Sequence, residues 1–149
     1  MSEATPKTAV DTSVIVAALL SWHEGHGPAS AVLGELLESD TPVVLPIQSL
    51  VEAYAVMTRL PPPHRLSAQD ALDLLEGSFR MRSNLVGLDG DEVWDLLHGL
   101  NRRNLIGGTS YDALILASAH KGGAQRMLTF NRSHFERAAT EGIEIMVPS

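Results

Sequence analysis

The stretch TAVDTSVIVAALL at residues 8–20 decides the fold, because a short apolar strand there meets an aspartate and an apolar helix follows at once. Residues 8–11 predict a buried strand, and residues 13–21 predict a helix. Packing of apolar side chains gives no reason for a carboxylate at this joint. In open α/β sheets, ligands bind in the crevice at the carboxyl ends of the strands. We therefore expect Asp11 to face a ligand site.

Composition limits the class of protein. At 149 residues the chain has the size of one domain, and 44% apolar residues are enough for a folded core. The absence of cysteine excludes disulfides and thiolate metal sites. A net charge of −7 argues against sequence-independent adhesion to nucleic acid, but it is compatible with acids gathered around a cation. Neither a signal peptide nor a membrane-spanning stretch is evident, so we expect a cytoplasmic protein without membrane contact.

Strand-like and helix-like segments alternate along the chain. Further strands are predicted over residues 42–46, 84–88, 126–130 and 143–147, and helices over 28–39, 47–59, 67–77, 89–103 and 111–121, with a short helix from Asn131 or Ser133. The prolines of residues 60–66 predict a stiff connector. The helix over 89–103 is expected to turn five apolar side chains inward: Val93, Trp94, Leu96, Leu97 and Leu100. This alternation predicts a single domain, 1–149, with a parallel sheet and helices on both faces.

Asp11 has an ordinary alternative role as a helix N-cap, although Thr12 and Ser13 are equally suited to that task. Glu52 lies between apolar residues inside the helix over 47–59. Its alternative is a capping box with Ser49, which requires that helix to start at Ser49.

Asp112 is the third acid of interest. Thr109 or Ser110 is the expected cap of its helix, and Thr109 has capping-box spacing to Asp112. The eight residues after Asp112 carry no charge at neutral pH, which predicts a buried helix. A buried carboxylate needs a partner, and a metal ion is one such partner. We interpret Asp11, Glu52 and Asp112 as acids that converge on a metal ion.

Other candidate sites are weaker. His23 and His26 flank Glu24 in a glycine-rich loop, but the spacing of a zinc-binding HExxH helix is absent. The acids near Asp89 are typical of a solvated helix start. The chain has no phosphate-cradling P-loop, no GxSxG elbow and no nucleophilic cysteine.

The acids in their order match a known family. The chain resembles a PIN domain, and specifically the VapC toxins, the ribonuclease halves of bacterial type II toxin–antitoxin pairs. The resemblance covers nearly the whole chain and is carried by the ordered motifs VDTSVI (10–15), VE (51–52), YDALI (111–115) and LTFNRSHF (128–135), together with the connector RLPPPHRL (59–66).

This resemblance implies a doubly wound α/β/α sandwich around a five-stranded parallel sheet. It implies metal-dependent endoribonuclease activity at Asp11, Glu52 and Asp112, in which water attacks an RNA phosphodiester in line and leaves a 5′-phosphate and a 3′-hydroxyl. Oxygen ligands alone suit Mg²⁺ or Mn²⁺. Many PIN domains have a fourth acid where this chain has Asn131, so Asn131 is expected to act through a water. The hydroxyls of Ser13 and Thr129 suit the task of orienting carboxylates.

The resemblance also implies partners: a VapB-like antitoxin, an RNA substrate and a second copy of the chain, with the helices over residues 54–75 as the expected contact surface. Two other classes stay open. One is a phosphoryl module, either a receiver domain or a haloacid-dehalogenase-like phosphatase. The phosphatase needs an aspartate where Ser13 stands, and the receiver needs a late lysine that Lys121 matches poorly. The other is a PIN fold that binds RNA or protein without cutting.

Overall fold

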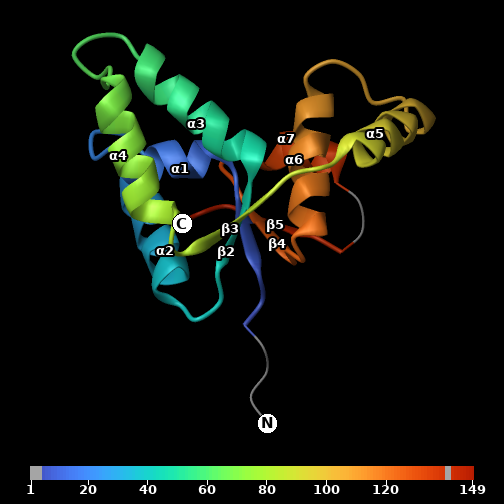
Figure 1. The fold of residues 1–149 in the computed structure, drawn as a ribbon, viewed down its shortest axis with the longest axis horizontal. Coiled ribbons are helices and arrows are strands. Elements are labelled where there is room, and N and C mark those ends of the chain that lie inside the picture. Colours follow the sequence, from blue (N-terminus) through green and yellow to red (C-terminus); the bar gives the residue numbers. More distant parts are fainter. Residues whose placement is uncertain (1–4, 140–141) are drawn as a thin grey trace.

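A computed structural model describes residues 5–139 and 142–149. Strands and helices alternate through this part of the chain (Figure 1). The strands are β1 (Thr8–Val10), β2 (Val43–Pro46), β3 (Ser83–Val86), β4 (Arg126–Leu128) and β5 (Glu144–Met146). The helices are α1 (Thr12–Leu19), α2 (His26–Glu38), α3 (Ile47–Arg59), α4 (Ala68–Phe79), α5 (Gly90–Arg102), α6 (Thr109–Lys121) and α7 (Arg132–Ala138). Each predicted element is therefore confirmed, with boundaries that differ by at most two residues.

The five strands form one sheet in the order β3-β2-β1-β4-β5, and every pair is parallel. Ala9 of the central strand pairs with Val44 on one side and with Met127 on the other. The chain first builds outward from β1 to β3 and then returns to β4 on the opposite side of β1. The direction of winding thus reverses between β1 and β4, which is where doubly wound sheets open a crevice for ligands.

The two faces of the sheet carry separate apolar clusters. Val10 and Leu128 pack with α1 to α4, whereas Ala9 and Met127 pack with Leu100 of α5 and with α6 and α7. Successive residues of a strand point to opposite faces, so a three-residue strand can serve both clusters. Figure 1 shows the resulting layers on either side of the sheet. The predicted α/β/α sandwich is confirmed.

Helix α5 differs from its prediction. Only Leu100 is buried, whereas Val93, Trp94 and Leu97 are exposed, Trp94 at 65%. The reason is position: α5 packs mainly on α6 and lies outermost in Figure 1, so much of its apolar stripe stays uncovered. Its start was predicted correctly, because Asp89 and Glu92 form a full capping box.

Two further features of the chain bear on the sequence predictions. The proline-rich segment between α3 and α4 is not helical, and Ser67 caps α4 by accepting a hydrogen bond from Asp70 N at 3.1 Å. Among the described residues, no helix is long and apolar enough to cross a membrane.

Candidate active site

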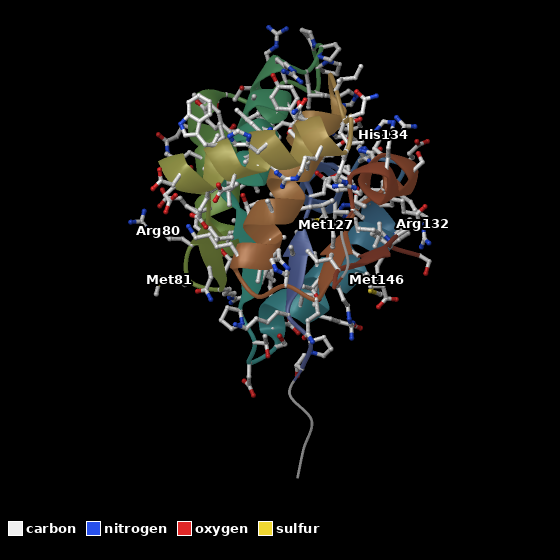
Figure 2. The ribbon with its side chains drawn as sticks, turned by 90° about the vertical axis from the view of Figure 1, so that its right-hand side faces the viewer. Arg80, Met81, Met127, Arg132, His134 and Met146 are labelled. Carbon is white, nitrogen blue, oxygen red and sulfur yellow. The ribbon has the colours of Figure 1, made fainter. Side chains whose placement is uncertain are left out.

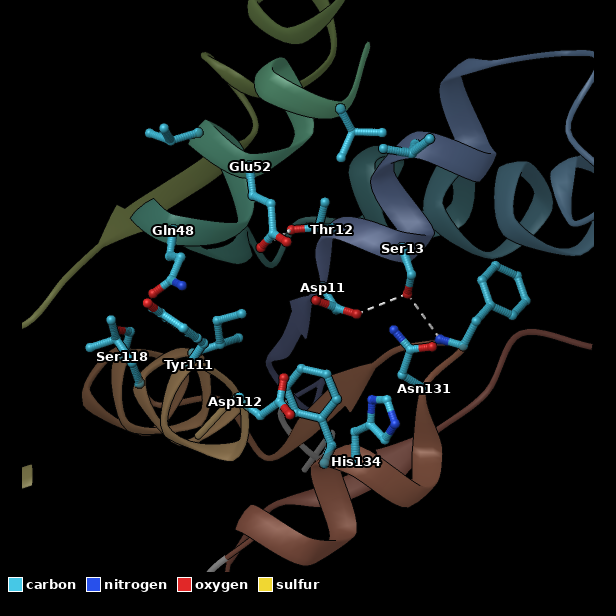
Figure 3. Close-up of a pocket in the computed structure, with 18 of the residues that line it drawn as sticks. Asp11, Thr12, Ser13, Gln48, Glu52, Tyr111, Asp112, Ser118, Asn131 and His134 are labelled. Carbon is cyan, nitrogen blue, oxygen red and sulfur yellow. Dashed lines mark hydrogen bonds between the residues drawn. The ribbon is translucent and has the colours of Figure 1, made fainter. Parts of the chain in front are cut away.

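Asp11 is held by hydroxyl groups, not by a helix end. It follows β1 directly, occupies the N-cap position of α1 and is only 4% exposed. Its side chain makes no capping hydrogen bond. Its Oδ2 instead accepts hydrogen bonds from Thr129 Oγ1 and Ser13 Oγ, both at 2.8 Å. Figure 3 shows the bond to Ser13. The ordinary N-cap role therefore does not explain this carboxylate. Thr12 and Ser13, which suited that role equally well in the sequence, do not fill it either, because α1 already begins at Thr12.

The two hydroxyls also join neighbouring strand ends. Thr129, which is fully buried, accepts a hydrogen bond from Asn131 N at 2.9 Å. Ser13 accepts one from Phe130 N at 3.1 Å. Each hydroxyl thus donates to Asp11 and accepts from the backbone that follows β4. The carboxylate, β1 and β4 form one hydrogen-bonded unit at the winding reversal.

Glu52 also lacks the capping role that its spacing allowed. Helix α3 begins at Ile47 with Pro46 as N-cap, so no capping box with Ser49 forms. Glu52 is exposed and accepts a hydrogen bond of 3.3 Å from Thr12 Oγ1, which also donates to Ser49 O at 3.1 Å. This contact ties the first residue of α1 to α3 and directs Glu52 toward Asp11 (Figure 3).

Asp112 occupies the first turn of α6. That helix begins at Thr109 with Gly108 as N-cap, and no side chain caps it, so the expected cap at Thr109 or Ser110 was wrong. Ser110 Oγ donates to Gly107 O instead. Asp112 is half-buried, and burial raises the pKa of its carboxyl above the usual 3.8.

Nearby charges also act on Asp112. The negative charges of Asp11 and Glu52 raise its pKa further, while His134 and Arg137 lower it. Asp112 therefore feels both other acids, although it comes from the opposite face of the sheet. The three acids belong to one electrostatic site.

One cavity of about 1650 Å³ contains all three acids. In Figure 3, Glu52 reaches into it from α3, Asp112 from α6, and Asp11 from the strand end between them. Ser13 and Asn131 also line the cavity, whereas Thr129 lies behind Asp11. The structure thus brings the sequence-predicted residues to one place from five separate elements or loops.

The chemistry of this cavity fits a hard divalent cation. Its acids offer only oxygen donors, and the mutual repulsion that acts on Asp112 is what a cation relieves. Gln48 Oε1, which is buried without a hydrogen-bond partner among the described residues, lines the same cavity. In that part of the chain, however, no three His, Asp or Glu side chains already stand at metal-binding distance.

Sequence reasoning assigned no role to several residues of this cavity. Gln48 of α3 and Tyr111 of α6 face each other across one side of it, and His134 and Arg137 of α7 line the other. The sequence position of His134, three residues after Asn131, could have predicted that it faces the same cavity, because residues three apart share a helix face.

His23 and His26 hold the loop between α1 and α2. His23 Nδ1 accepts a hydrogen bond from Gly25 N at 2.9 Å, and His26 Nδ1 lies 3.0 Å from Ala17 O. His23 reaches the rim of the cavity, and His26 does not line it. Both rings therefore have structural contacts that account for their positions.

Fold and site together define a doubly wound α/β/α domain with a cluster of acids at its winding reversal. Comparison with known proteins gives the family. The PIN domain family matches residues 8–141. The chain is 38% identical over 117 residues to Ribonuclease VapC40 of Mycobacterium tuberculosis, which covers 78% of this chain and 81% of that protein. The chain belongs to the PIN domain family and, within it, to the VapC ribonucleases.

Solved structures share the fold at lower identity. The sarcin-ricin loop cleaving toxin VapC20 of Mycobacterium tuberculosis has a TM-score of 0.69 at 18% identity, covering 91% of this chain and 98% of that one. VapBC2 from Rickettsia felis, solved bound to a DNA fragment from its promoter, has a TM-score of 0.65 at 17% identity, covering 95% and 98%. The five-stranded parallel architecture is therefore that of VapC proteins.

Proposed function

We propose that this protein is the toxin of a type II toxin–antitoxin pair and cuts RNA phosphodiester bonds with the help of Mg²⁺, a role that Mn²⁺ can also fill. One observation carries the proposal. Asp11, Glu52 and Asp112 each had an ordinary capping role available, none of them performs it, and all three line one cavity. Membership of the VapC ribonucleases supports the same activity.

The residues have distinct tasks in this proposal. Asp11 would be the most firmly held ligand of the cation, because two hydroxyls fix its carboxylate through Oδ2. Glu52 and Asp112 complete the ligand set, and Asn131 contributes through a water. When bound, the ion lowers the pKa of water and offsets the charge that develops on the phosphate. Ser13 and Thr129 keep the carboxylate of Asp11 turned toward the cavity.

The competing classes have less support. A haloacid-dehalogenase-like phosphatase needs an acid at position 13, where the Ser13 hydroxyl instead donates to Asp11. A receiver domain needs a lysine in the site, whereas Lys121 lies at the far end of α6 and pairs with Glu92. A PIN fold that binds RNA or protein without cutting does not require three acids in one cavity, so the acids that line this cavity without capping a helix favour cleavage.

Cleavage of purified total RNA tests the proposal. We expect products with Mg²⁺ or Mn²⁺, none in EDTA, and none from Asp112→Asn. The matched control is Asp91→Asn, which makes the same change on exposed α5 and should cut like the wild type. Cleavage that persists in EDTA, or that Asp112→Asn leaves unchanged, rules out the metal site.

We also propose a VapB-like antitoxin and a second copy of the chain as partners. Tyr54, Leu72 and Leu74 are exposed apolar side chains on α3 and α4, within the surface expected from the sequence. Leu72→Arg should weaken dimerisation or antitoxin binding, as measured by size-exclusion chromatography. Leu97→Arg is the control, because Leu97 is similarly exposed on α5. If Leu97→Arg weakens association and Leu72→Arg does not, the interface lies on α5 and not on α3 and α4.

A further inference from the structure

Helix α7 and its N-cap residue present a row of polar side chains to the acidic cavity. Asn131, His134 and Arg137 are spaced by three residues, and all three line the cavity. In Figure 3, Asn131 and His134 lie beside Asp11 and Asp112. Phe135 is buried and anchors the helix to the core on its inner side. The row is thus held at a fixed place relative to the acids.

The row brings positive charge to a cavity whose other charged side chains are mostly acids. Four acids line it, namely Asp11, Glu24, Glu52 and Asp112, whereas Arg137 is the only Lys or Arg among the described residues that do so. His134 and Arg137 both lower the pKa of Asp112, so their fields extend to the acids. A phosphate entering an acidic cavity is repelled unless positive groups meet it. Besides a metal ion, His134 and Arg137 supply such groups beside the acids.

Arg132 provides a contrast on the same helix. It lies 3.6 Å from Glu136, and its side chain lines a separate, smaller depression beside β5. Figure 2 shows Arg132 and His134 on different sides of α7. The helix therefore carries two arginines of equal charge, one in the cavity and one outside it.

We infer that His134 and Arg137 bind successive phosphates of a single RNA strand and lay that strand across the acids. His134 contacts the phosphate next to Asp112, and Arg137 contacts the next one along the strand. Side chains three apart on a helix are neighbours about 5–6 Å apart, so both can contact one strand. A planar guanidinium suits phosphate oxygens, and an imidazole N–H donates to them. The inference rests on the proposed function, because it takes RNA as the substrate.

RNA binding in EDTA tests Arg137 without any cleavage. Asp11→Asn protein is titrated with a fluorescent single-stranded RNA at several salt concentrations. Adding Arg137→Ala should weaken binding about tenfold and reduce the slope of log K against log salt by about 0.7, the loss of one phosphate contact. Adding Arg132→Ala removes the same charge from the same helix and should change neither. Equal weakening by the two variants overturns the inference.

His134 is tested by steady-state cleavage in the otherwise wild-type protein. His134→Ala should lower kcat/KM about tenfold, as expected for a lost hydrogen bond to a charged group. His134→Gln keeps an N–H donor and should recover part of the loss. The melting temperature should not change, because this side chain is exposed. Full activity of His134→Ala, or no difference between Ala and Gln, overturns its part.

The two assays separate this inference from the proposed function. Protein that binds RNA through Arg137 but never cuts it supports the phosphate row and overturns the ribonuclease proposal. If the protein cuts RNA but neither Arg137→Ala nor Arg132→Ala weakens RNA binding, only the inference about phosphate contacts on α7 is overturned. Protein that binds no RNA overturns both.

Discussion

Asp11 and Asp112 share one cavity but are held in opposite ways. Asp11 is buried at a strand end, and two hydroxyls fix its carboxylate. Asp112 is half-buried on a helix, forms no side-chain hydrogen bond with the described residues, and has a raised pKa. One half of the site is therefore organised by the sheet before any ligand binds. The other half carries electrostatic strain that a cation can relieve.

The largest effect should come from Asp11→Asn. The amide oxygen can still accept from Ser13 and Thr129, so the fold and the melting temperature should be unchanged. The lost charge should weaken the hold on the cation that offsets the charge developing on the phosphate, and reduce RNA cleavage on the order of 10²–10³-fold, as is typical when such electrostatic stabilisation is removed. Single-turnover cleavage with Mg²⁺ measures the loss. Near-normal cleavage by a folded Asp11→Asn protein would mean that the ordered half of the site is not catalytic.

Thr129→Val should disrupt the hydrogen bonds that hold Asp11 without changing Asp11 itself. It removes a donor to Asp11 and leaves Asn131 N without its acceptor, while the volume stays nearly the same. A buried polar group left without a partner costs about 1–3 kcal/mol, and cleavage should fall because Asp11 is no longer oriented. Urea unfolding and the cleavage assay measure the two losses.

Thr58→Val is the matched control for that prediction. The Thr58 hydroxyl donates to Tyr54 O within α3, a carbonyl that belongs to a regular helix. Its loss should alter stability little and cleavage not at all. If the two valine variants have equal stabilities, the hydroxyl at position 129 does not hold the site together.

The same contrast explains how much the sequence could predict. The fold was predictable, because hydrophobic periodicity marks the elements and strands that are separated by helical segments favour a parallel sheet. The place of Asp11 in the site was predictable, because a short apolar segment followed by an aspartate marks the end of a strand from a few neighbouring residues alone. The contact of Thr129 with Asp11 spans 118 positions, so only the pairing of β4 with β1 brings them together.

The errors also have physical reasons. Thr109 and Ser110 had the local sequence context of caps, but α6 begins at Thr109 with Gly108 as its N-cap, because capping preference is a weak guide to the first residue of a helix. The inward face predicted for α5 failed because periodicity reports an apolar stripe and not the number of neighbours available to cover it. His134 and Arg137 were overlooked because neither is unusual until α7 is placed beside the acids.

A thermal shift with metal should separate the two aspartates from ordinary surface acids. Mg²⁺ should raise the melting temperature of the wild type, since a ligand that binds only the native state stabilises it by about 2.7 kcal/mol at a hundred times its Kd. Asp112→Asn should lose most of this rise, and Asp91→Asn should keep it. An equal rise in Asp112→Asn and the wild type would remove Asp112 from the metal site.

The smallest effect should be a pH dependence of stability in EDTA. The folded pKa of Asp112 lies above its usual 3.8, so ionised Asp112 destabilises the folded state. Below pH 3.8 the carboxyl is neutral in both states, and Asp112→Asn should match the wild type. As pH rises through the folded pKa the wild type loses stability that the variant keeps, so the variant should melt at the higher temperature near neutral pH. Asp91→Asn, which also removes one negative charge, should show no such pH-dependent gain. If Asp112→Asn melts lower than the wild type at neutral pH, Asp112 has a stabilising partner and its half of the site is not strained.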